Sequence, residues 1–166
     1  DNAYPVLKIY KYPSAVFLVS DLVGNENMWD CEKIRDRKQL LDWDRILELK
    51  NNGVIFGSHS RTHPFLTALS EKELRDETEV SKTAIEEKLK SPVEFFCYPY
   101  GDYNEGVLSA VREAGYRAAI TMRRGYVFMN DNPFEIRRVS IKLKTHPLSF
   151  LYRLHVNHKS RDESIA

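Results

Sequence analysis

The sequence predicts an α/β fold, either a parallel sheet or a barrel, in a single domain. Short apolar runs of strand length alternate with segments that have the apolar spacing of amphipathic helices. This alternation is typical of parallel β-sheets, because each helix returns the chain to the same edge before the next strand. Polar motifs follow two of the runs, at strand ends where such folds place their active sites.

In the first half of the chain we expect helices over 3–11, 40–52 and 70–90, strands over 15–19 and 54–56, and a polar loop over 21–38. The run 15–19 is continuously apolar, as in a strand that is buried on both faces. Gly53 ends the second helix, and Ser70 with Glu73 forms a capping box at the start of the third. The many charges between residues 71 and 90 predict a solvated outer face for that helix.

In the second half we expect strands over 93–97, 117–121 and 136–141, helices over 105–114 and 148–154, and loops over 98–104 and 125–133. Gly115 closes the first of these helices. The polar tail 157–166 is expected to fray, which places the domain over residues 1–156.

Composition excludes several classes of partner. The 166 residues carry 25 Lys and Arg against 24 Asp and Glu, so no net field attracts nucleic acid or an anionic membrane. No apolar run approaches the ~18 residues that span a bilayer. The two cysteines, Cys31 and Cys97, form no disulfide framework, and Cys97 lies in an apolar run as an expected buried thiol.

A histidine pair lies in the string Gly57-Ser58-His59-Ser60-Arg61-Thr62-His63-Pro64, directly after an apolar run. A strand can deliver His59, and a tight polar turn can bring His63 back to the same point. Ser60 and Thr62 can hydrogen-bond within that turn. Neutral imidazole is the commonest protein ligand for zinc-like ions, so the pair is a candidate metal site, although surface pairs at this spacing are also common.

A second motif, residues 98–104 (Tyr-Pro-Tyr-Gly-Asp-Tyr-Asn), follows the expected strand 93–97. Pro99 stiffens the approach and Gly101 permits an unusual backbone angle. Such a turn can direct the backbone N–H of Tyr100 outward, as an oxyanion donor requires. The alternative is an aromatic-rich turn that only fills the rim of the sheet, and this motif alone does not decide between them.

Together the two strings resemble the polysaccharide deacetylases of the NodB-homology type, a carbohydrate esterase family. Further similar segments are 3–10, 13–18, 53–59, 66–70 and 114–119. The resemblance therefore covers about residues 1–140, and the histidine string is its most specific part.

The resemblance implies a distorted (β/α) barrel that uses a divalent metal, usually zinc, with cobalt or nickel as substitutes. It implies that His59 and His63 are metal ligands and that the backbone N–H of Tyr100 holds the oxyanion. Pro99, Tyr100 and Gly101 would line the substrate site. The implied partner is an N-acetylated glycan, with a cell-envelope or extracellular location; no nucleic-acid partner and no membrane span are expected, and the oligomeric state stays open.

The chain departs from the family's pattern at both ends. In the family, an Asp-Asp pair supplies the third metal ligand and the base, on a strand before the helix that begins near Ala3. Asp1 falls too late to be either member, so we expect the first strand, both Asp residues and the acid His upstream of Asp1. His155 is the nearest candidate for the family's late Leu-x-His motif, followed by His146 and His158, and each is expected to be a surface or helix-end residue.

The sequence thus predicts a metal-dependent hydrolase that removes N-acetyl groups from a glycan or cell-envelope polysaccharide. One alternative is a non-catalytic glycan-binding module or structural relic with an incomplete metal site. Another is a metal-dependent hydrolase of the same fold that acts on a small amide. The sequence does not select among chitin, peptidoglycan and poly-N-acetylglucosamine as the glycan.

Overall fold

The sheet at the centre of the molecule is parallel throughout. A computed structural model describes residues 3–27, 29, 37–141 and 145–155. Its five strands follow the chain in the order β1-β2-β3-β4-β5, and every neighbouring pair is parallel. The strands are β1 (Ala15–Leu18), β2 (Ile55–Ser58), β3 (Phe95–Cys97), β4 (Ala118–Arg124) and β5 (Ile136–Arg138). This order confirms the parallel α/β prediction. It is also the order of a (β/α) barrel, in which each strand lies beside the previous one, whereas the strand order of a doubly wound sheet reverses part-way across the sheet.

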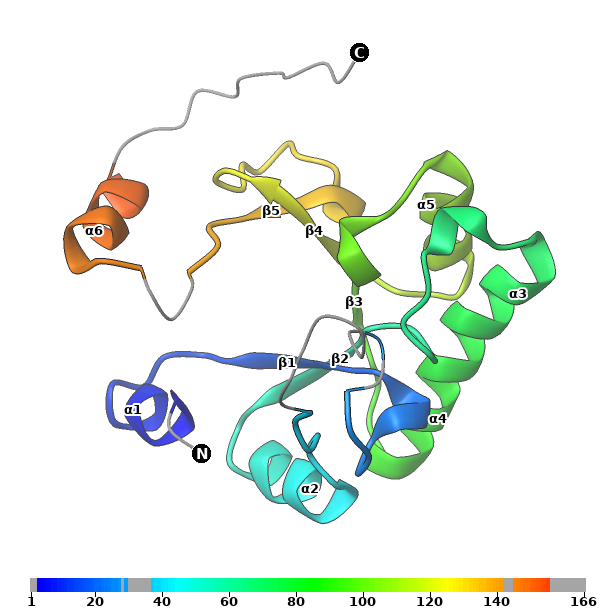
Figure 1. The fold of residues 1–166 in the computed structure, drawn as a ribbon, viewed down its shortest axis with the longest axis horizontal. Helices are drawn as coiled ribbons and strands as arrows, with labels where there is room; N and C mark the ends of the chain where they lie inside the picture. The colour runs from blue at the N-terminus through cyan, green and yellow to red at the C-terminus, as the bar shows by residue number, and fades with distance from the viewer. Residues whose placement is uncertain (1–2, 28, 30–36, 142–144, 156–166) are drawn as a thin grey trace.

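Helices lie on the outside of the sheet, where they connect its strands or, in the first and last cases, flank its ends. They are α1 (Ala3–Ile9), α2 (Trp43–Asn51), α3 (Glu71–Arg75), α4 (Ser81–Leu89), α5 (Glu105–Glu113) and α6 (Pro147–His155). Figure 1 shows α3, α4 and α5 together on one side of the sheet, with α1 beside the start of β1. Among the described residues, no helix is long and apolar enough to cross a membrane.

The core lies between the sheet and its helices. Its fully buried apolar side chains come from helices, strands and the turns between them: Ile46, Leu66, Ile85, Val93, Phe96 and Val111. Cys97 is buried at the end of β3, as predicted, and burial raises the pKa of its thiol to about 11. Cys31 lies outside the described residues, as does the predicted tail 157–166.

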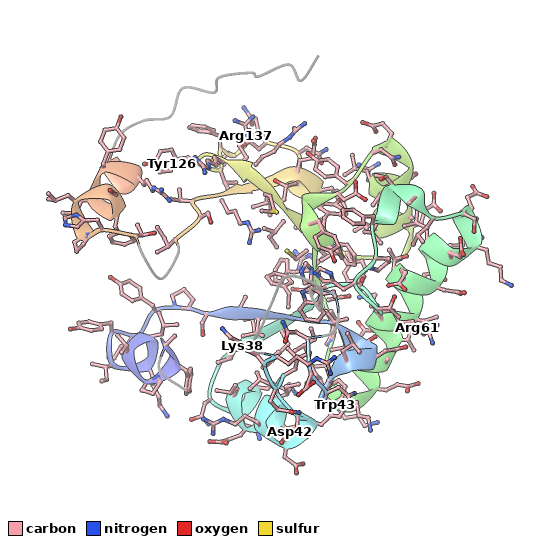
Figure 2. The ribbon with its side chains drawn as sticks, viewed as in Figure 1. Lys38, Asp42, Trp43, Arg61, Tyr126 and Arg137 are labelled. Atoms are coloured by element: carbon pink, nitrogen blue, oxygen red, sulfur yellow. The ribbon has the colours of Figure 1, made fainter. Side chains whose placement is uncertain are left out.

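Helix α2 begins three residues later than its apolar pattern predicts, because Asp42 caps it. The Asp42 carboxylate accepts a hydrogen bond from Arg45 N at 2.8 Å, which satisfies a backbone donor of the first turn. Figure 2 shows Asp42 and Trp43 at this end of the helix.

The predicted helix 70–90 contains an irregularity. The capping box at Ser70 and Glu73 forms as expected, but a π turn, η4 (Asp76–Val80), separates α3 from α4. The solvated-face prediction is wrong for Glu77, which is 8% exposed. A π turn holds one residue more than an α turn, so it rotates the side chains on either side of it relative to a regular helix.

Candidate active site

The two motifs lie side by side at one edge of the sheet. His59 follows β2 directly, and the turn η5 (Pro99–Gly101) begins two residues after β3. Strands β2 and β3 are neighbours and run parallel, so both motifs leave the sheet at its carboxyl edge. This is the edge at which parallel α/β folds place their active sites.

The ring of His59 is oriented by the main chain of β3. Its Nδ1 lies 2.6 Å from the carbonyl oxygen of Cys97. A carbonyl only accepts, so Nδ1 carries the proton and Nε2 keeps its lone pair available for a ligand. Burial lowers the pKa of His59, a shift that the Cys97 hydrogen bond opposes and the positive charge of Arg138 assists. The imidazole is therefore held neutral, the form that binds a metal ion.

His63 is brought against His59 by a turn with an unusual backbone. Ser60 and His63 have φ values of 65° and 67°, and the Ser60 hydroxyl accepts a hydrogen bond from His63 N at 3.0 Å. The two imidazole ring centroids are 4.7 Å apart, with an angle of 82° between the ring planes. His63 is 7% exposed. The structure thus joins the two histidines in one place, and Ser60 bonds within the turn as predicted.

Two imidazoles at this separation fit a divalent metal ion, since the tautomer of His59 directs Nε2 away from the Cys97 carbonyl. Among the described residues, no group of three or more His, Cys, Asp or Glu side chains could hold an ion. The carboxylate ligand, the base and the acid that we expect upstream of Asp1 stay a prediction.

The turn after β3 is more strained than its glycine alone predicts. Tyr100 has φ 57° and ψ 1°, and Gly101 follows with φ 70°, so two consecutive residues are left-handed. The turn is closed by hydrogen bonds from Gly101 N to Tyr98 O at 3.0 Å and from Asp102 N to Pro99 O at 2.9 Å. A Cβ on Gly101 would lie 2.7 Å from Met122 Cγ, so this position needs glycine for space as well as for conformation.

Aromatic rings form a wall around His63. Trp29 stacks on His63 with ring centroids 4.5 Å apart, and Tyr100 meets His63 edge-on at 4.6 Å. Phe65 stacks on Tyr100 at 4.3 Å and is 57% exposed. The sequence identifies Tyr100 in this group but not Trp29 or Phe65, because nothing around a single aromatic residue in a loop indicates which rings it will contact.

A carboxylate joins the second motif to the turn that follows the histidine loop. Asp102 accepts hydrogen bonds from Thr67 N at 2.9 Å and from Thr67 Oγ1 at 2.9 and 3.0 Å. Thr67 belongs to the turn η3 (Leu66–Ala68), which follows the histidine loop. This bridge could not be predicted from the sequence, because Thr67 and Asp102 lie 35 positions apart.

Glu77 contacts the histidine loop from the π turn. Its carboxylate accepts hydrogen bonds from Arg61 N, Thr62 N and the Thr62 hydroxyl. The Thr62 side chain therefore bonds across to the helical segment rather than within its own turn. Nothing in the sequence separates Glu77 from the charged residues around it.

The other candidate histidines lie elsewhere. His146 is exposed before α6, and its Nδ1 accepts a hydrogen bond from Leu148 N at 3.2 Å. It therefore has the helix-end role that was expected of it. His155 is the last residue of α6, and His158 lies outside the described residues.

Comparison with known proteins gives a consistent result. The family model for polysaccharide deacetylase matches residues 1–119. A poly-beta-1,6-N-acetyl-D-glucosamine N-deacetylase of Staphylococcus aureus (strain MSSA476) is 26% identical over 144 residues, which cover 85% of this chain and 49% of that protein. The chain spans slightly less than half the length of the curated relatives it matches.

Solved structures show the same fold. The Streptococcus pyogenes deacetylase PplD, in complex with acetate, superposes with a TM-score of 0.78 at 22% identity, covering 93% of this chain and 64% of that one. The Bacillus anthracis protein BA3943, a CE4 family pseudoenzyme, gives 0.53 at 22% identity over 69% of this chain and 35% of that one. The NodB-type fold predicted from the motifs is thereby confirmed. Because the family model covers more than half of its residues, the chain belongs to the polysaccharide deacetylase family.

Proposed function

We propose that the protein is a divalent-metal-dependent hydrolase that removes N-acetyl groups from a glycan. The observation that carries the proposal is the His59–His63 pair, in which the Cys97 carbonyl fixes one tautomer and leaves Nε2 for an ion. The family membership and the N-acetylglucosamine polymer in the name of the staphylococcal relative support the glycan as substrate class. Zinc is the proposed ion, with cobalt or nickel as substitutes.

When bound, the ion supplies Lewis acidity toward the acetamide carbonyl and toward water. The protein's own residues supply position. His59 and His63 hold the ion, and the backbone N–H of Tyr100 donates to the carbonyl oxygen as negative charge develops on it. Tyr100 and Gly101 line the substrate side, and the exposed ring of Phe65 extends this surface beyond Tyr100. Pro99, which the sequence also predicts at the substrate site, is fully buried, so it supports the turn rather than lining the surface.

Acetate release from N-acetylated oligosaccharides by the full-length protein tests the proposal. We expect release that stops with a chelator, returns with added Zn²⁺ and is absent in His59→Ala. The matched control is His146→Ala, which removes an exposed histidine at a helix end and should leave the rate unchanged.

Two other results would each support a different function. Metal binding without acetate release from any glycan would favour the small-amide hydrolase. Binding of neither metal nor oligosaccharide would favour a structural module; a pseudoenzyme, BA3943, is known among the proteins that share this fold.

A further inference from the structure

We propose that Glu77 is a positioning residue for the metal-ligand pair: its carboxylate fixes the loop between His59 and His63, and through it the relative placement of the two imidazoles. The expected effect on metal binding rests on the proposed function, but the hydrogen bonds between Glu77 and the loop that support the inference do not. It concerns a residue that touches neither histidine ring in the contacts described above.

The three hydrogen bonds to Glu77 all come from the middle of the loop. Oε2 accepts from Arg61 N at 2.8 Å and from Thr62 N at 2.9 Å, and Oε1 accepts from Thr62 Oγ1 at 2.6 Å. Both backbone amides lie between the left-handed residues Ser60 and His63. An ionised carboxylate is a strong acceptor for paired backbone donors, so it can hold this conformation at modest cost.

Arg61 contacts Glu77 through its backbone N–H, while its side chain pairs with another carboxylate. The Arg61 guanidinium pairs with Asp21, with Nε 2.8 Å from Oδ2. Figure 2 places Arg61 beside the helical segment that carries Glu77. Asp21 N in turn donates to Arg61 O at 3.1 Å, which ties the outer side of the loop to the turn that follows β1, η1 (Ser20–Leu22).

The π turn is what presents Glu77 to the loop, and a buried hydroxyl network holds that turn. Thr78 O accepts hydrogen bonds from Tyr116 Oη at 2.9 Å and from Ser81 Oγ at 3.2 Å. Thr78 Oγ1 donates back to Leu74 O at 2.9 Å. Burial raises the pKa of Tyr116 to about 12, so its hydroxyl stays a donor at all ordinary pH values.

The same network reaches the residue before the first histidine. Ser58 Oγ and Ser81 Oγ are 2.7 Å apart, and neither side chain is exposed. The helical segment therefore holds the histidine loop at two places, at Ser58 where it leaves β2 and at residues 61–62 in its middle. The first anchor directly precedes His59 and the second directly precedes His63, so together they define the backbone path that places both imidazoles.

The test compares Glu77→Gln with Glu79→Gln in the full-length protein. Glu77→Gln keeps the size of the side chain but replaces one acceptor oxygen with an amide that faces backbone donors. Glu79 is exposed on the same turn, so its variant controls for charge and helix propensity. We expect Glu77→Gln to weaken binding of Zn²⁺ alone by about 10-fold in calorimetry, the lower end of the cost of losing a direct hydrogen bond to a ligand, because Glu77 acts through the loop backbone. Glu79→Gln should bind as the wild type does.

A second readout needs no metal. In the metal-free protein, the imidazole NMR resonances of His59 and His63 should move or broaden in Glu77→Gln and stay in place in Glu79→Gln. Thr62→Val, which removes one of the three donors, should give a smaller change of the same kind.

The outcomes separate the two proposals. If the wild-type protein binds no Zn²⁺, the proposed function fails, and the imidazole resonances still decide the role of Glu77. If Glu77→Gln lowers thermal stability but leaves both the Zn²⁺ affinity and the imidazole resonances of the folded protein unchanged, Glu77 has a stabilising role only and the inference is overturned.

Discussion

The proton on Nδ1 of His59 determines which nitrogen of the ring can bind a ligand. It is held by a main-chain oxygen of β3, at residue 97, so the tautomer does not depend on which side chain that position carries. Burial keeps the ring neutral by lowering its pKa. The result is a neutral imidazole whose Nε2 keeps its lone pair, as the proposed metal role requires.

At Tyr100, a substitution can separate the role of the backbone N–H from that of the aromatic ring. Proline cannot be used to remove its N–H, because proline requires a φ near −65° and Tyr100 has φ 57°. Tyr100→Gly keeps the N–H and accepts the left-handed conformation. We expect kcat to stay close to the wild-type value, whereas loss of an oxyanion donor costs about 10²-fold or more. Steady-state kinetics on an N-acetylated oligosaccharide measures this.

Phe65→Ala is the matched control for that variant. It removes the ring stacked on Tyr100 and leaves the backbone of the turn in place. We expect it to raise KM with little effect on kcat. A hundredfold loss of kcat in Tyr100→Gly, without the same loss in Phe65→Ala, would assign the work to the Tyr100 ring and contradict the oxyanion role of its N–H.

At the scale of elements, Asp102 joins the turn η3, which follows the histidine loop, to the end of η5, which follows β3. Removal of this carboxylate in Asp102→Ala leaves Thr67 N and Thr67 Oγ1 without their acceptor. The bridge lies near solvent, so we expect the free energy of unfolding to fall by only about 1–2 kcal/mol. Urea unfolding checks this, and Thr67→Ser, which keeps both donors, should be close to wild type. An unchanged unfolding curve for Asp102→Ala would show that the bridge does not form in solution.

At the scale of the whole molecule, β1 and β5 stand at the two ends of the strand order. Beside β1, the segment from α1 to its start exposes Ile9, Tyr10 and Tyr12, and no side chain of α1 is buried. Apolar surface next to a sheet edge favours pairing with another chain. We therefore expect a product of these 166 residues alone to dimerise or aggregate.

Analytical ultracentrifugation over a range of concentrations measures this association. Ile9→Lys should weaken it, because it places a charge on the exposed segment. Met129→Lys is the matched control, since Met129 is fully exposed in the loop that follows β4. A monomer at every concentration, or equal effects of the two variants, would refute the assignment of the interface to this edge.

The strands and the histidine pair could be predicted because each has a local cause. Continuous apolar runs mark the strands, and Gly53 and the Ser70–Glu73 box mark helix ends. The prediction that the run 15–19 is buried on both faces is wrong, because β1 is at the end of the strand order and only Leu18 of its four residues is buried. The roles of Glu77 and Asp102 could not be predicted, because each depends on partners 15 or more positions away. The left-handed conformation at Tyr100 is set by the closed turn around it rather than by its own preference.

The two anchors of the histidine loop have a consequence for protein engineering. A five-residue His-x-x-x-His string grafted onto another scaffold would lack the acceptor at Glu77 and the hydroxyl at Ser81, both supplied from a later helical segment. Such a graft should relax toward ordinary turn conformations and lose the mutual placement of its imidazoles. The smallest portable unit is the stretch from Ser58 to Ser81 with its π turn intact, together with a neighbouring strand whose carbonyl can hold the first ring.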